Sequence, residues 1–407
     1  MPVVAVVGAG AAGMMAAIHA ARAGAQVVLL ERTRDGGRKI LISGGGRCNV
    51  LPARLDESRF VTDSSPNTLK KILRSWPLRE QIEFFERDLG LVLVEETESA
   101  KLFPSSDKAR DVRDGLLNLA AGLGVQFVSN TLVTGFGPVA DRWRVEIENA
   151  EPLVVDAVIV ATGGLSVPAT GSDGRGLAVL KRLGHTIHST YAALTPVTAD
   201  PAPFAQLSGV SLTVSVTARD EIRSAVATGG FLFTHKGYSG PSVLDVSHVL
   251  VRARSEQRKG TLTVKWTEWD DKGWEAALKP EGTRTVLGVV RKQLPDRLAE
   301  ALAGSAGIDP AQTLSQLKRD ERRRLIDTMV RGELPWSGDE GYKKAEVTGG
   351  GVSLAEIDPR TMESRKHPGL FISGEALDAF GPIGGYNFYW AWATGKAAGL
   401  GAARKSG

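Results

Sequence analysis

The chain has 407 residues, which is enough for two or three domains with sizeable hydrophobic cores. Its residues are 42% hydrophobic and 24% charged, and the formal net charge of +4 is too small to indicate a nucleic-acid-binding protein by itself. No stretch is apolar enough to span a membrane, and no secretory leader is recognisable. The single cysteine excludes intramolecular disulfides and Cys-x-x-Cys metal sites, so a cytoplasmic location is expected.

The first thirty residues are typical of a dinucleotide-binding βαβ unit. Val3–Val7 is a continuous β-branched run, which predicts a strand buried on both faces of a parallel sheet. An alanine-rich helix is expected to extend to about Arg22, and a second strand is expected over 26–30. The motif G-x-G-x-x-G stands between the first strand and the helix, which is the position that pyrophosphate binding requires.

Each residue of this motif has a separate physical task. Gly8 permits a tight turn, Gly10 lets the backbone approach a pyrophosphate, and Gly13 lets the helix pack closely on the strand. The helix amino terminus, around Ala12, offers N–H groups and the positive end of its dipole to the phosphates. Glu31, at the end of the second strand, can accept hydrogen bonds from ribose hydroxyls and repels a 2′-phosphate. We therefore expect an ADP-containing dinucleotide other than NADP in this pocket.

Two later segments favour FAD over NAD. Residues 156–166 form a buried strand that ends in Thr162-Gly163-Gly164, and residues 368–399 form another strand followed by Gly374 and Glu375. A glycine-rich loop and a helix starting near Tyr386 come next. A nicotinamide-binding domain does not need a strand and helix from the carboxy-terminal part of the chain. A flavin does, because its ribityl chain and ring extend beyond the first pocket and must be bound by a second protein segment. Glu375 is expected near the ribityl or phosphate region, and the helix amino terminus near the flavin pyrimidine.

Eight motifs, in one order along the chain, resemble those of a bacterial flavoprotein family, the BaiN/RdsA-like NAD(P)/FAD-dependent oxidoreductases. They include GGRKILISGGGRCN (36–49), VATGGLSVPATGSDGRG (160–176), FLFTHKGYSGPSVL (231–244) and GGYNFYWAWATGKAAG (384–399). The matching is weaker between about 250 and 340. Members of this family include aminoacetone oxidase-like proteins and reductases of steroid-like enones, within the fumarate reductase-like branch of the glutathione-reductase-type FAD fold.

The resemblance implies an α/β protein. A Rossmann-like FAD-binding domain with three ββα layers is expected to carry an inserted α+β domain that caps the flavin. The expected boundaries are 1–189 for the first part of the FAD domain, 190–344 for the insert and 345–407 for the second part. Within the insert, helical periodicity predicts helices at about 284–303 and 311–331.

The resemblance also places the glycine- and cation-rich segment 36–49 beside the flavin. Glycines there would let the backbone approach the ring, while Arg38 and Lys39 would balance the pyrophosphate and the reduced flavin. Cys48 is expected to be a packed thiol, since one cysteine cannot form an intramolecular disulfide. The cofactor-binding residues expected from the motifs and the resemblance are Gly8, Gly10, Ala12, Gly13, Glu31, Arg32, Arg38, Lys39, Ser43, Gly44, Gly45, Gly46, Ala161, Thr162, Gly163, Gly374, Glu375, Gly385, Tyr386 and Asn387.

The candidate catalytic residues are His235, Tyr238 and Tyr386, because each side chain can donate or accept a proton. His235 is equally consistent with a residue that only holds a turn, and Tyr386 with a flavin contact. Ser239 is expected to cap a helix that has Pro241 in its first turn. The histidines show none of the spacings of a metal site, so no metal is expected.

The expected reaction is hydride transfer between flavin N5 and a small or medium organic substrate. NAD(P)H-driven reduction of an activated C=C or C=O is favoured, with NAD(P)H docking transiently because a second dinucleotide motif is missing. Amine or aminoketone oxidation is an alternative that the residues do not exclude. An RNA-modifying flavoenzyme and a non-catalytic flavin sensor are two further alternatives. The pI of about 9.1 favours RNA, whereas the small net charge and the lack of a basic, aromatic stripe argue against nucleic acid as a partner.

Overall fold

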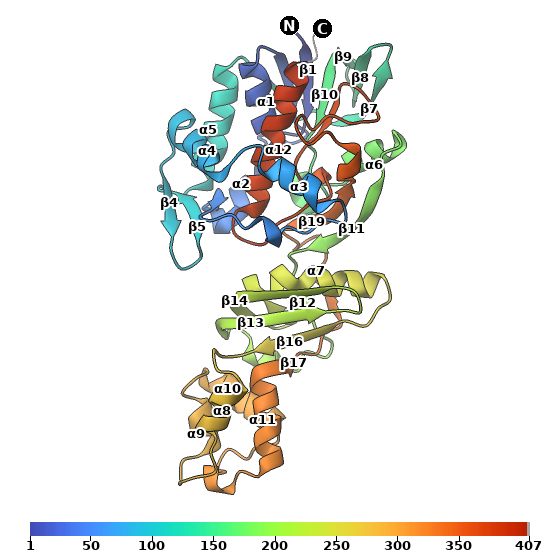
Figure 1. The fold of residues 1–407 in the computed structure, drawn as a ribbon. Helices are drawn as coiled ribbons and strands as arrows, with labels where there is room; N and C mark the ends of the chain where they lie inside the picture. The colour runs from blue at the N-terminus through green and yellow to red at the C-terminus, as the bar shows by residue number, and fades with distance from the viewer. Residues whose placement is uncertain (405–407) are drawn as a thin grey trace. The chain divides into compact units, whose positions relative to one another are not determined.

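The computed structural model describes residues 1–404 and divides the chain into two compact units, which Figure 1 colours by position along the chain. Unit 1 comprises Met1–Tyr191 and Glu346–Gly407, and unit 2 comprises Ala192–Ala345. Each unit has a hydrophobic core of its own. Unit 1 is therefore built from the two ends of the chain, and unit 2 is inserted between them.

A five-stranded parallel sheet forms the centre of unit 1, with the strand order β20-β10-β1-β2-β6. The strands are β1 (Val3–Val7), β2 (Gln26–Leu30), β6 (Gln126–Val128), β10 (Ala157–Val160) and β20 (Leu370–Ile372). All residues of β10 and β20 are buried, as are four of the five in β1. Burial on both faces explains why these strands are continuous apolar runs instead of alternating ones.

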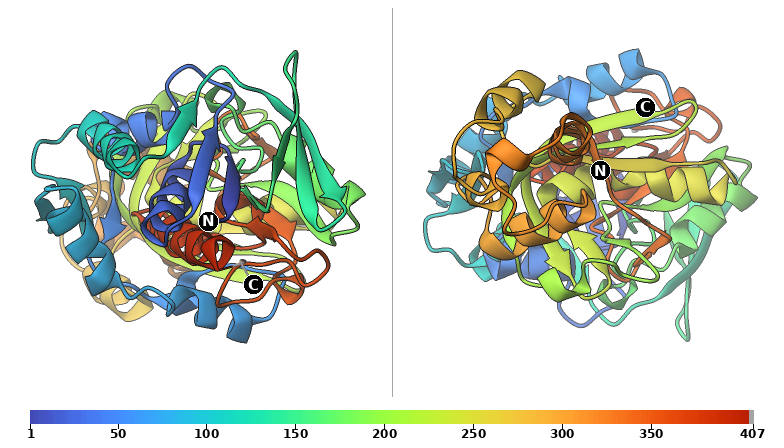
Figure 2. Two further views of the ribbon diagram at one scale, coloured as in Figure 1. Left: turned by 90° about the horizontal axis from the view of Figure 1, so that it is seen from above. Right: turned by 90° about the horizontal axis from the view of Figure 1, so that it is seen from below.

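Two helices from opposite ends of the chain pack side by side on this sheet. They are α1 (Ala11–Arg22) and α12 (Tyr386–Ala403), which the left view of Figure 2 shows in blue and red. Glycines permit the close approach, since a Cβ at Gly395 would lie 2.4 Å from the carbonyl oxygen of Ala12. Unit 1 also contains a separate three-stranded antiparallel sheet, formed by β7 (Val133–Val139), β8 (Arg142–Ile147) and β9 (Leu153–Val155). The expected Rossmann-like fold is confirmed.

Shorter elements complete unit 1. The helices are α2 (Arg38–Ile42), α3 (Pro66–Leu73), α4 (Leu78–Glu83), α5 (Ala109–Gly122) and α6 (Arg175–Arg182). The strands β3 (Leu51–Pro52), β5 (Lys101–Pro104) and β4 (Leu93–Glu96) form one small sheet, and β11 (Ile187–Ala193) pairs with β19 (Val347–Val352). Among residues 1–404, no helix is both long and apolar enough to cross a membrane.

Unit 2 contains a seven-stranded antiparallel sheet with the order β17-β16-β13-β14-β15-β12-β18. Its strands are β12 (Val197–Thr198), β13 (Ser211–Arg219), β14 (Ser224–Thr234), β15 (Gly237–Ser239), β16 (Thr261–Lys265), β17 (Gly332–Glu333) and β18 (Gly338–Asp339). The helix α7 (Pro241–Ser255) packs against β13 and β14. A helical part follows β16 and consists of α8 (Asp271–Ala277), α9 (Val286–Val290), α10 (Asp296–Ser305) and α11 (Arg319–Arg331).

Three local expectations for unit 2 were wrong. The helix predicted over 284–303 is divided into α9 and α10, because Pro295 stands at the start of α10 and cannot continue a preceding helix. The helix predicted from 311 begins at Arg319 instead. The helix α7 is preceded by Gly240, whose φ of 94° suits glycine, while Ser239 belongs to β15.

Candidate functional site

The turn between β1 and α1 contains three glycines, of which two are in close contact with the protein and one borders open space. Gly8 has a φ of 101°, and a Cβ there would lie 2.6 Å from the carbonyl oxygen of Ala161. A Cβ at Gly13 would lie 1.8 Å from the carbonyl oxygen of Gly8. A Cβ at Gly10, by contrast, would meet nothing within 4 Å. Protein packing thus requires two of the glycines, whereas Gly10 keeps space open at the amino terminus of α1, and helix amino termini are suited to bind phosphates.

Glu31 lies beside this turn, and groups of the protein donate hydrogen bonds to both of its carboxylate oxygens. Its Oε2 accepts a hydrogen bond from the Ala9 N–H at 2.8 Å, and its Oε1 accepts from the Thr33 N–H at 2.8 Å and from the Thr33 hydroxyl at 2.7 Å. The residue is 7% exposed. A carboxylate offers about four acceptor positions, so Glu31 keeps capacity for a ribose hydroxyl. The next residue, Arg32, forms an ion pair with Asp173.

Glu375 is the centre of a polar network at the carboxyl end of the parallel sheet. The Lys39 ammonium lies 2.5 Å from Glu375 Oε2 and 2.5 Å from Ser166 Oγ. The Ser166 hydroxyl and the Thr348 N–H both donate to Glu375 Oε1. Burial opposes ionisation of Glu375, but Lys39 and the hydrogen bonds from Ser166 and Thr348 lower the pKa of its carboxyl below the usual value. Glu375 is therefore a carboxylate paired with a lysine.

Thr348 holds the loop that follows β10. Its Oγ1 accepts hydrogen bonds from the Leu165 N–H at 2.7 Å and the Ser166 N–H at 3.0 Å. A Cβ at Gly164 would lie only 2.4 Å from this Oγ1, so the loop needs glycine there. Local sequence patterns gave no role to Ser166, and they made Thr348, together with Glu346, only a further candidate for lining the substrate pocket. The threonine comes from β19, and no local motif links it to the β10 loop.

Two buried hydroxyls at this sheet edge have no hydrogen-bond partner among the described residues. They are Thr162 Oγ1, two positions after the end of β10, and Ser373 Oγ, directly after β20. Buried polar atoms are nearly always hydrogen-bonded, so two orphaned hydroxyls on neighbouring strands indicate a place that a ligand completes. Together with the open space at Gly10 and the available acceptor positions of Glu31, they fit a dinucleotide laid along the strand ends.

The segment after α2 is a run of left-handed backbone. Gly44, Gly45 and Gly46 have φ values of 56°, 68° and 89°, which side chains strongly disfavour. A Cβ at Gly45 would meet nothing within 4 Å, and none of the three glycines is buried. The backbone of residues 44–46 therefore stays exposed and carries no side chain of its own. This is the property that the family resemblance implied for a segment beside the flavin. Ser43 bonds to the Ile40 carbonyl at 2.8 Å.

Only one of the neighbouring cations belongs to the Glu375 network. Lys39 does, whereas the Arg38 side chain is 41% exposed and its Nε lies 3.4 Å from Asp35 Oδ1. Cys48, further along, is fully buried, and burial raises the pKa of its thiol to about 12. Such a thiol does not form a thiolate near neutral pH, so the expected packed thiol is confirmed.

At the start of α12, the candidate side chains bind nearby backbone. The Tyr386 hydroxyl donates to the Arg54 carbonyl and accepts from the Asp56 N–H, both at 3.3 Å. The Asn387 side chain bonds to both the N–H and the carbonyl of Gly381, each at 2.9 Å. These two residues hold the loops that surround the helix start. Gly385, before them, has a φ of 87°.

The other two catalytic candidates belong to unit 2. His235 is exposed in the turn between β14 and β15. Tyr238 is 1% exposed, its hydroxyl donates to the Pro335 carbonyl at 3.0 Å, and burial raises the pKa of the phenol above its usual value. Within residues 1–404, no group of three or more histidine, cysteine or acidic side chains is arranged to hold a metal.

The chain matches known proteins along nearly its whole length. A family model described as "HI0933-like protein Rossmann domain" matches residues 2–401. A "Ribosomal RNA dihydrouridine synthase" from Escherichia coli K12 is 32% identical over 96% of this chain and 95% of its own length. A "3-dehydro-bile acid delta(4,6)-reductase" from Clostridium scindens is 30% identical over 98% of each chain.

A solved structure has the same fold. It is a 3-ketosteroid delta1-dehydrogenase from Sterolibacterium denitrificans, which is 12% identical, covers all of both chains and gives a TM-score of 0.55. That identity carries information on the fold alone, while the family model and the relatives cover nearly the entire sequence. The chain therefore belongs to the HI0933-like Rossmann family and is an FAD-dependent oxidoreductase.

Proposed function

We propose that this enzyme uses NAD(P)H to reduce a C=C double bond conjugated to a carbonyl. The observation that carries the proposal is a bond change common to two relatives that match almost the whole chain. Dihydrouridine differs from uridine by two hydrogens across a ring double bond conjugated to a carbonyl. A delta(4,6)-reductase of a 3-dehydro bile acid acts on double bonds conjugated to the 3-oxo group. Both names describe saturation of an enone-type bond.

The reaction balances with one donor. NAD(P)H gives up a hydride and becomes NAD(P)⁺, and the substrate double bond gains that hydride and one proton from water or an acid. FAD, when bound, relays the two electrons. The protein residues hold the cofactor through the glycine turn and Glu31, keep the strand-end loops in place through Lys39 and Glu375, and supply the proton.

His235 is the proposed proton donor among the three candidates. The hydroxyls of Tyr238 and Tyr386 both donate to backbone carbonyls, and these residues are 1% and 6% exposed. His235 is exposed in the turn between β14 and β15, and its imidazole can donate a proton. Of the three candidates, His235 is therefore the one whose side chain a substrate can reach.

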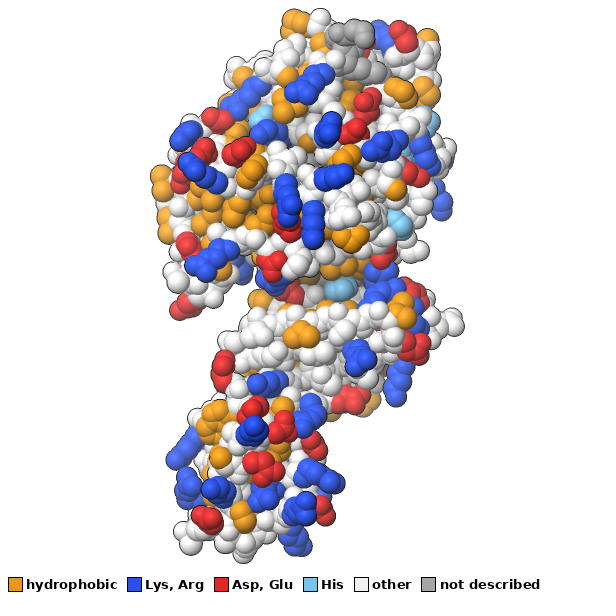
Figure 3. All heavy atoms as spheres, in the orientation of Figure 1, with side chains coloured by type: hydrophobic (Ala, Val, Ile, Leu, Met, Phe, Trp, Pro, Cys, Tyr) orange, Lys and Arg blue, Asp and Glu red, His pale blue; other side chains and the backbone are white. Residues whose placement is uncertain are grey.

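Two classes of substrate carry the required bond. The relative from Escherichia coli favours a uracil ring within ribosomal RNA, and the relative from Clostridium scindens favours a free enone. Surface charge gives RNA no additional support, because Lys and Arg side chains intermingle with Asp and Glu over each unit on the face shown in Figure 3. The formal net charge is +4. Either substrate agrees with the proposed bond chemistry.

An anaerobic titration tests this function. The purified holoprotein should show two flavin absorption bands that bleach when NADH or NADPH is added without oxygen. Adding a 3-oxo-Δ4-steroid, or ribosomal RNA transcribed in vitro with unmodified uridine, should restore the bands, and mass spectrometry should find the acceptor heavier by two hydrogens. Recovery with only one acceptor class identifies the substrate.

Two results would overturn the proposal. If aminoacetone bleaches the flavin and NAD(P)H does not, the enzyme is an amine-type oxidase. If no donor bleaches the bands, the protein is a flavin sensor without reductase activity.

A further inference from the structure

Lys101 is a half-buried cation in the small sheet of unit 1, at the first position of β5. A Cβ added to Gly384 would lie 3.5 Å from Lys101 Cε and 3.6 Å from its Cγ, so the lysine stem lies against this glycine. Gly384 comes directly before Gly385, the residue that precedes α12. The charged end of Lys101 therefore lies beside the loop that leads into α12.

The same face of β5 also meets the glycine-rich segment after α2. Lys101 and Phe103 are two positions apart in the strand, so their side chains lie on one face. A Cβ at Gly44 would lie 3.1 Å from Phe103 Cε1, and the guanidinium carbon of Arg47 lies 4.1 Å from the centroid of the Phe103 ring. One face of β5 thus contacts both of the glycine-rich segments that are expected beside the flavin.

The order of the parallel strands indicates the direction in which a bound dinucleotide extends. Glu31 follows β2, the glycine turn follows β1, and the next strands in the order are β10 and β20. A dinucleotide whose ADP half lies at Glu31 and the glycine turn therefore extends past β1 toward β10 and β20. Glu375 follows β20, and the Gly384 loop comes after it, before α12. This direction brings the flavin half toward the loop that contacts Lys101.

The Lys101 ammonium has no ion-pair partner within residues 1–404, although acidic residues are near. Glu96 stands opposite Lys101 in the β4–β5 pair, but its carboxylate lies 3.0 Å from Arg47 Nη2. Glu375 is paired with Lys39. Both acids therefore have other cations as partners, and the charge of Lys101 is left to interact with an anion from outside the chain.

One further carboxyl, that of Glu346, is close enough for Lys39 and Lys101 to lower its pKa. Desolvation by the surrounding protein acts in the opposite direction and is stronger, so the pKa of Glu346 is raised above its usual value. A carboxyl with a raised pKa loses its proton less readily than an ordinary one, so it compensates a neighbouring cation less fully. Glu346 therefore does not replace the missing partner of Lys101.

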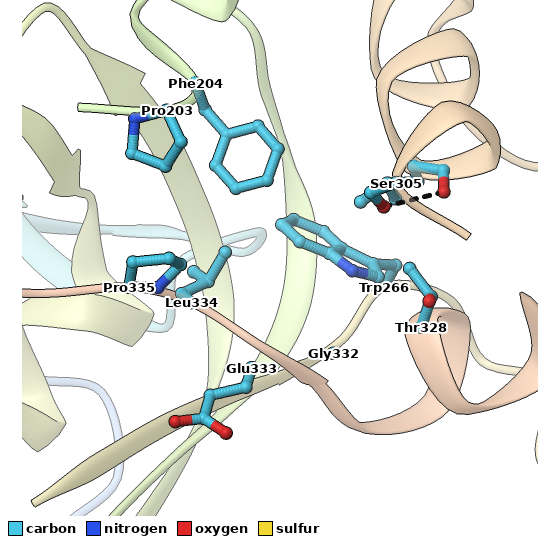
Figure 4. Close-up of a pocket in the computed structure, with 10 residues that line it drawn as sticks. Pro203, Phe204, Trp266, Ser305, Thr328, Gly332, Glu333, Leu334 and Pro335 are labelled. Atoms are coloured by element: carbon cyan, nitrogen blue, oxygen red, sulfur yellow. Dashed lines mark hydrogen bonds between the residues drawn. The ribbon is translucent and has the colours of Figure 1, made fainter. Parts of the chain in front are cut away.

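An unpartnered polar group can serve a ligand only where the ligand can reach it. The pocket of unit 2 drawn in Figure 4 has a volume of about 250 Å³, but its Trp266 is 1% exposed. The indole N–H of Trp266 has no partner within residues 1–404 and is closed to a ligand as well. Lys101 differs, because solvent reaches its side chain and Gly384 adds no side chain of its own beside it.

We propose that Lys101 is a flavin-facing cation, which stabilises the negative charge that the flavin ring gains on reduction. A hydride brings two electrons and one proton to the neutral oxidised ring, so the ring becomes an anion unless a second proton follows. An ammonium beside the ring favours that anion over the neutral oxidised form. The inference rests on the FAD cofactor and not on the proposed reductase function, because any hydride donor produces the same charge.

The redox potential of the bound flavin measures this preference. The FAD-loaded, full-length protein is reduced with dithionite without oxygen, in the presence of a reference dye of known potential. Lys101→Met keeps an unbranched side chain against Gly384 and removes the charge. It should bind reduced FAD about tenfold less tightly relative to oxidised FAD, which lowers the two-electron midpoint potential by about 30 mV. Lys101→Arg keeps the charge and should stay close to the wild type.

Lys108→Met is the matched control. Lys108 is exposed, follows β5 in the chain and makes no capping hydrogen bond with its side chain at the start of α5. The substitution removes the same charge and should leave the potential unchanged. The dissociation constant of oxidised FAD, measured by quenching of its fluorescence, should be the same in all of these variants. Lys101→Gln is a second neutral variant and should behave as Lys101→Met does.

Four results would overturn the proposal. The first is an unchanged potential in the neutral variants, and the second is an equal change in Lys108→Met. The third is loss of oxidised FAD from both Lys101→Met and Lys101→Gln but not from Lys101→Arg, since the charge would then serve the oxidised cofactor. The fourth is an unchanged potential with a raised KM for the acceptor, which would place the lysine against the substrate. Failure of NAD(P)H to bleach the flavin affects none of these measurements, because dithionite supplies the electrons.

Discussion

Lys39 and Glu375 are separated by 336 positions in the chain, yet the Lys39 Nζ lies 2.5 Å from Glu375 Oε2. The pair joins the glycine-rich segment after β2 to the loop after β20. The side chains are 27% and 17% exposed, so solvent screens the pair only in part. The ion pair thus links the first and second parts of the FAD-binding unit.

Removing the lysine should therefore leave a carboxylate without its counterion. We expect Lys39→Met to lower the free energy of unfolding by about 1–3 kcal/mol, which is less than the loss of about 3–5 kcal/mol for a fully buried pair, because these side chains are partly exposed. The double variant Lys39→Met/Glu375→Gln should recover much of this loss. Arg38→Met, which removes an exposed cation 3.4 Å from Asp35, should change stability by less than about 1 kcal/mol. Urea unfolding measures all three; equal effects of the two single variants would refute a special role for the pair.

Substitutions at Gly10 and Gly13 should have different consequences. Gly10→Leu places a side chain in open space, so the variant should fold but retain no FAD and purify colourless. Gly13→Ala places a Cβ 1.8 Å from the Gly8 carbonyl oxygen and should destabilise the fold itself. Circular dichroism and the visible spectrum separate the two outcomes. A fully yellow Gly10→Leu protein would contradict the phosphate site.

Stability should fall as the pH drops below about 6.5, because of His19. Burial lowers the pKa of this imidazole to about 3, with Lys396 and Arg22 contributing. Between about pH 6.5 and 3, the unfolded chain binds a proton that the folded protein does not, so folding is favoured less as the pH falls. The expected slope is about 1.4 kcal/mol per pH unit for this single proton. His19→Gln should flatten the slope between pH 6.5 and 4.5 in urea unfolding; an unchanged slope would show that other groups cause it.

A second acid-sensitive group should act at lower pH. Burial opposes ionisation of Glu356, but hydrogen bonds from Lys366, Thr186 and His185 lower the pKa of its carboxyl to about 2. Its stabilising effect is complete above the unfolded pKa near 4.5 and is lost as the pH falls toward 2. Glu356→Gln should remove stability at pH 7 and have progressively less effect below pH 4.5. A constant effect across that range would contradict the assignment.

His235→Ala should slow substrate reduction without loss of bound FAD, since the exposed imidazole is the proposed proton donor. Bleaching of the flavin by NAD(P)H should keep its rate, while reoxidation by the acceptor should slow, a split that a purely structural role would not produce. Lys236→Ala, at the exposed neighbouring position, is the control and should leave both rates unchanged. If His235→Ala reduces the substrate as fast as the wild type, His235 is not the proton donor and only stabilises the turn between β14 and β15.

Local signals in the sequence predicted the nucleotide-binding unit well. The strands Val3–Val7 and Gln26–Leu30 were expected at these bounds, and the helix between them ends at Arg22 as expected. Such elements are determined by short-range patterns: a β-branched run, a glycine turn and a small-residue helix. The burial of Cys48 was also expected. In these cases the physical cause lies within a few residues of the feature itself.

Longer-range features needed the tertiary structure. The sequence gives Glu375 a position after a buried strand, but only packing brings Lys39, Ser166 and Thr348 onto its carboxylate. The same applies to Thr162 and Ser373, whose buried hydroxyls have no hydrogen-bond partner among residues 1–404. Residue type and spacing were sufficient to predict the Rossmann-like fold, its FAD cofactor and a glycine turn between the first strand and helix. Which polar atoms are paired and which are left for a ligand was decided by contacts between distant segments, because burial and hydrogen bonding depend on every element that packs around a group.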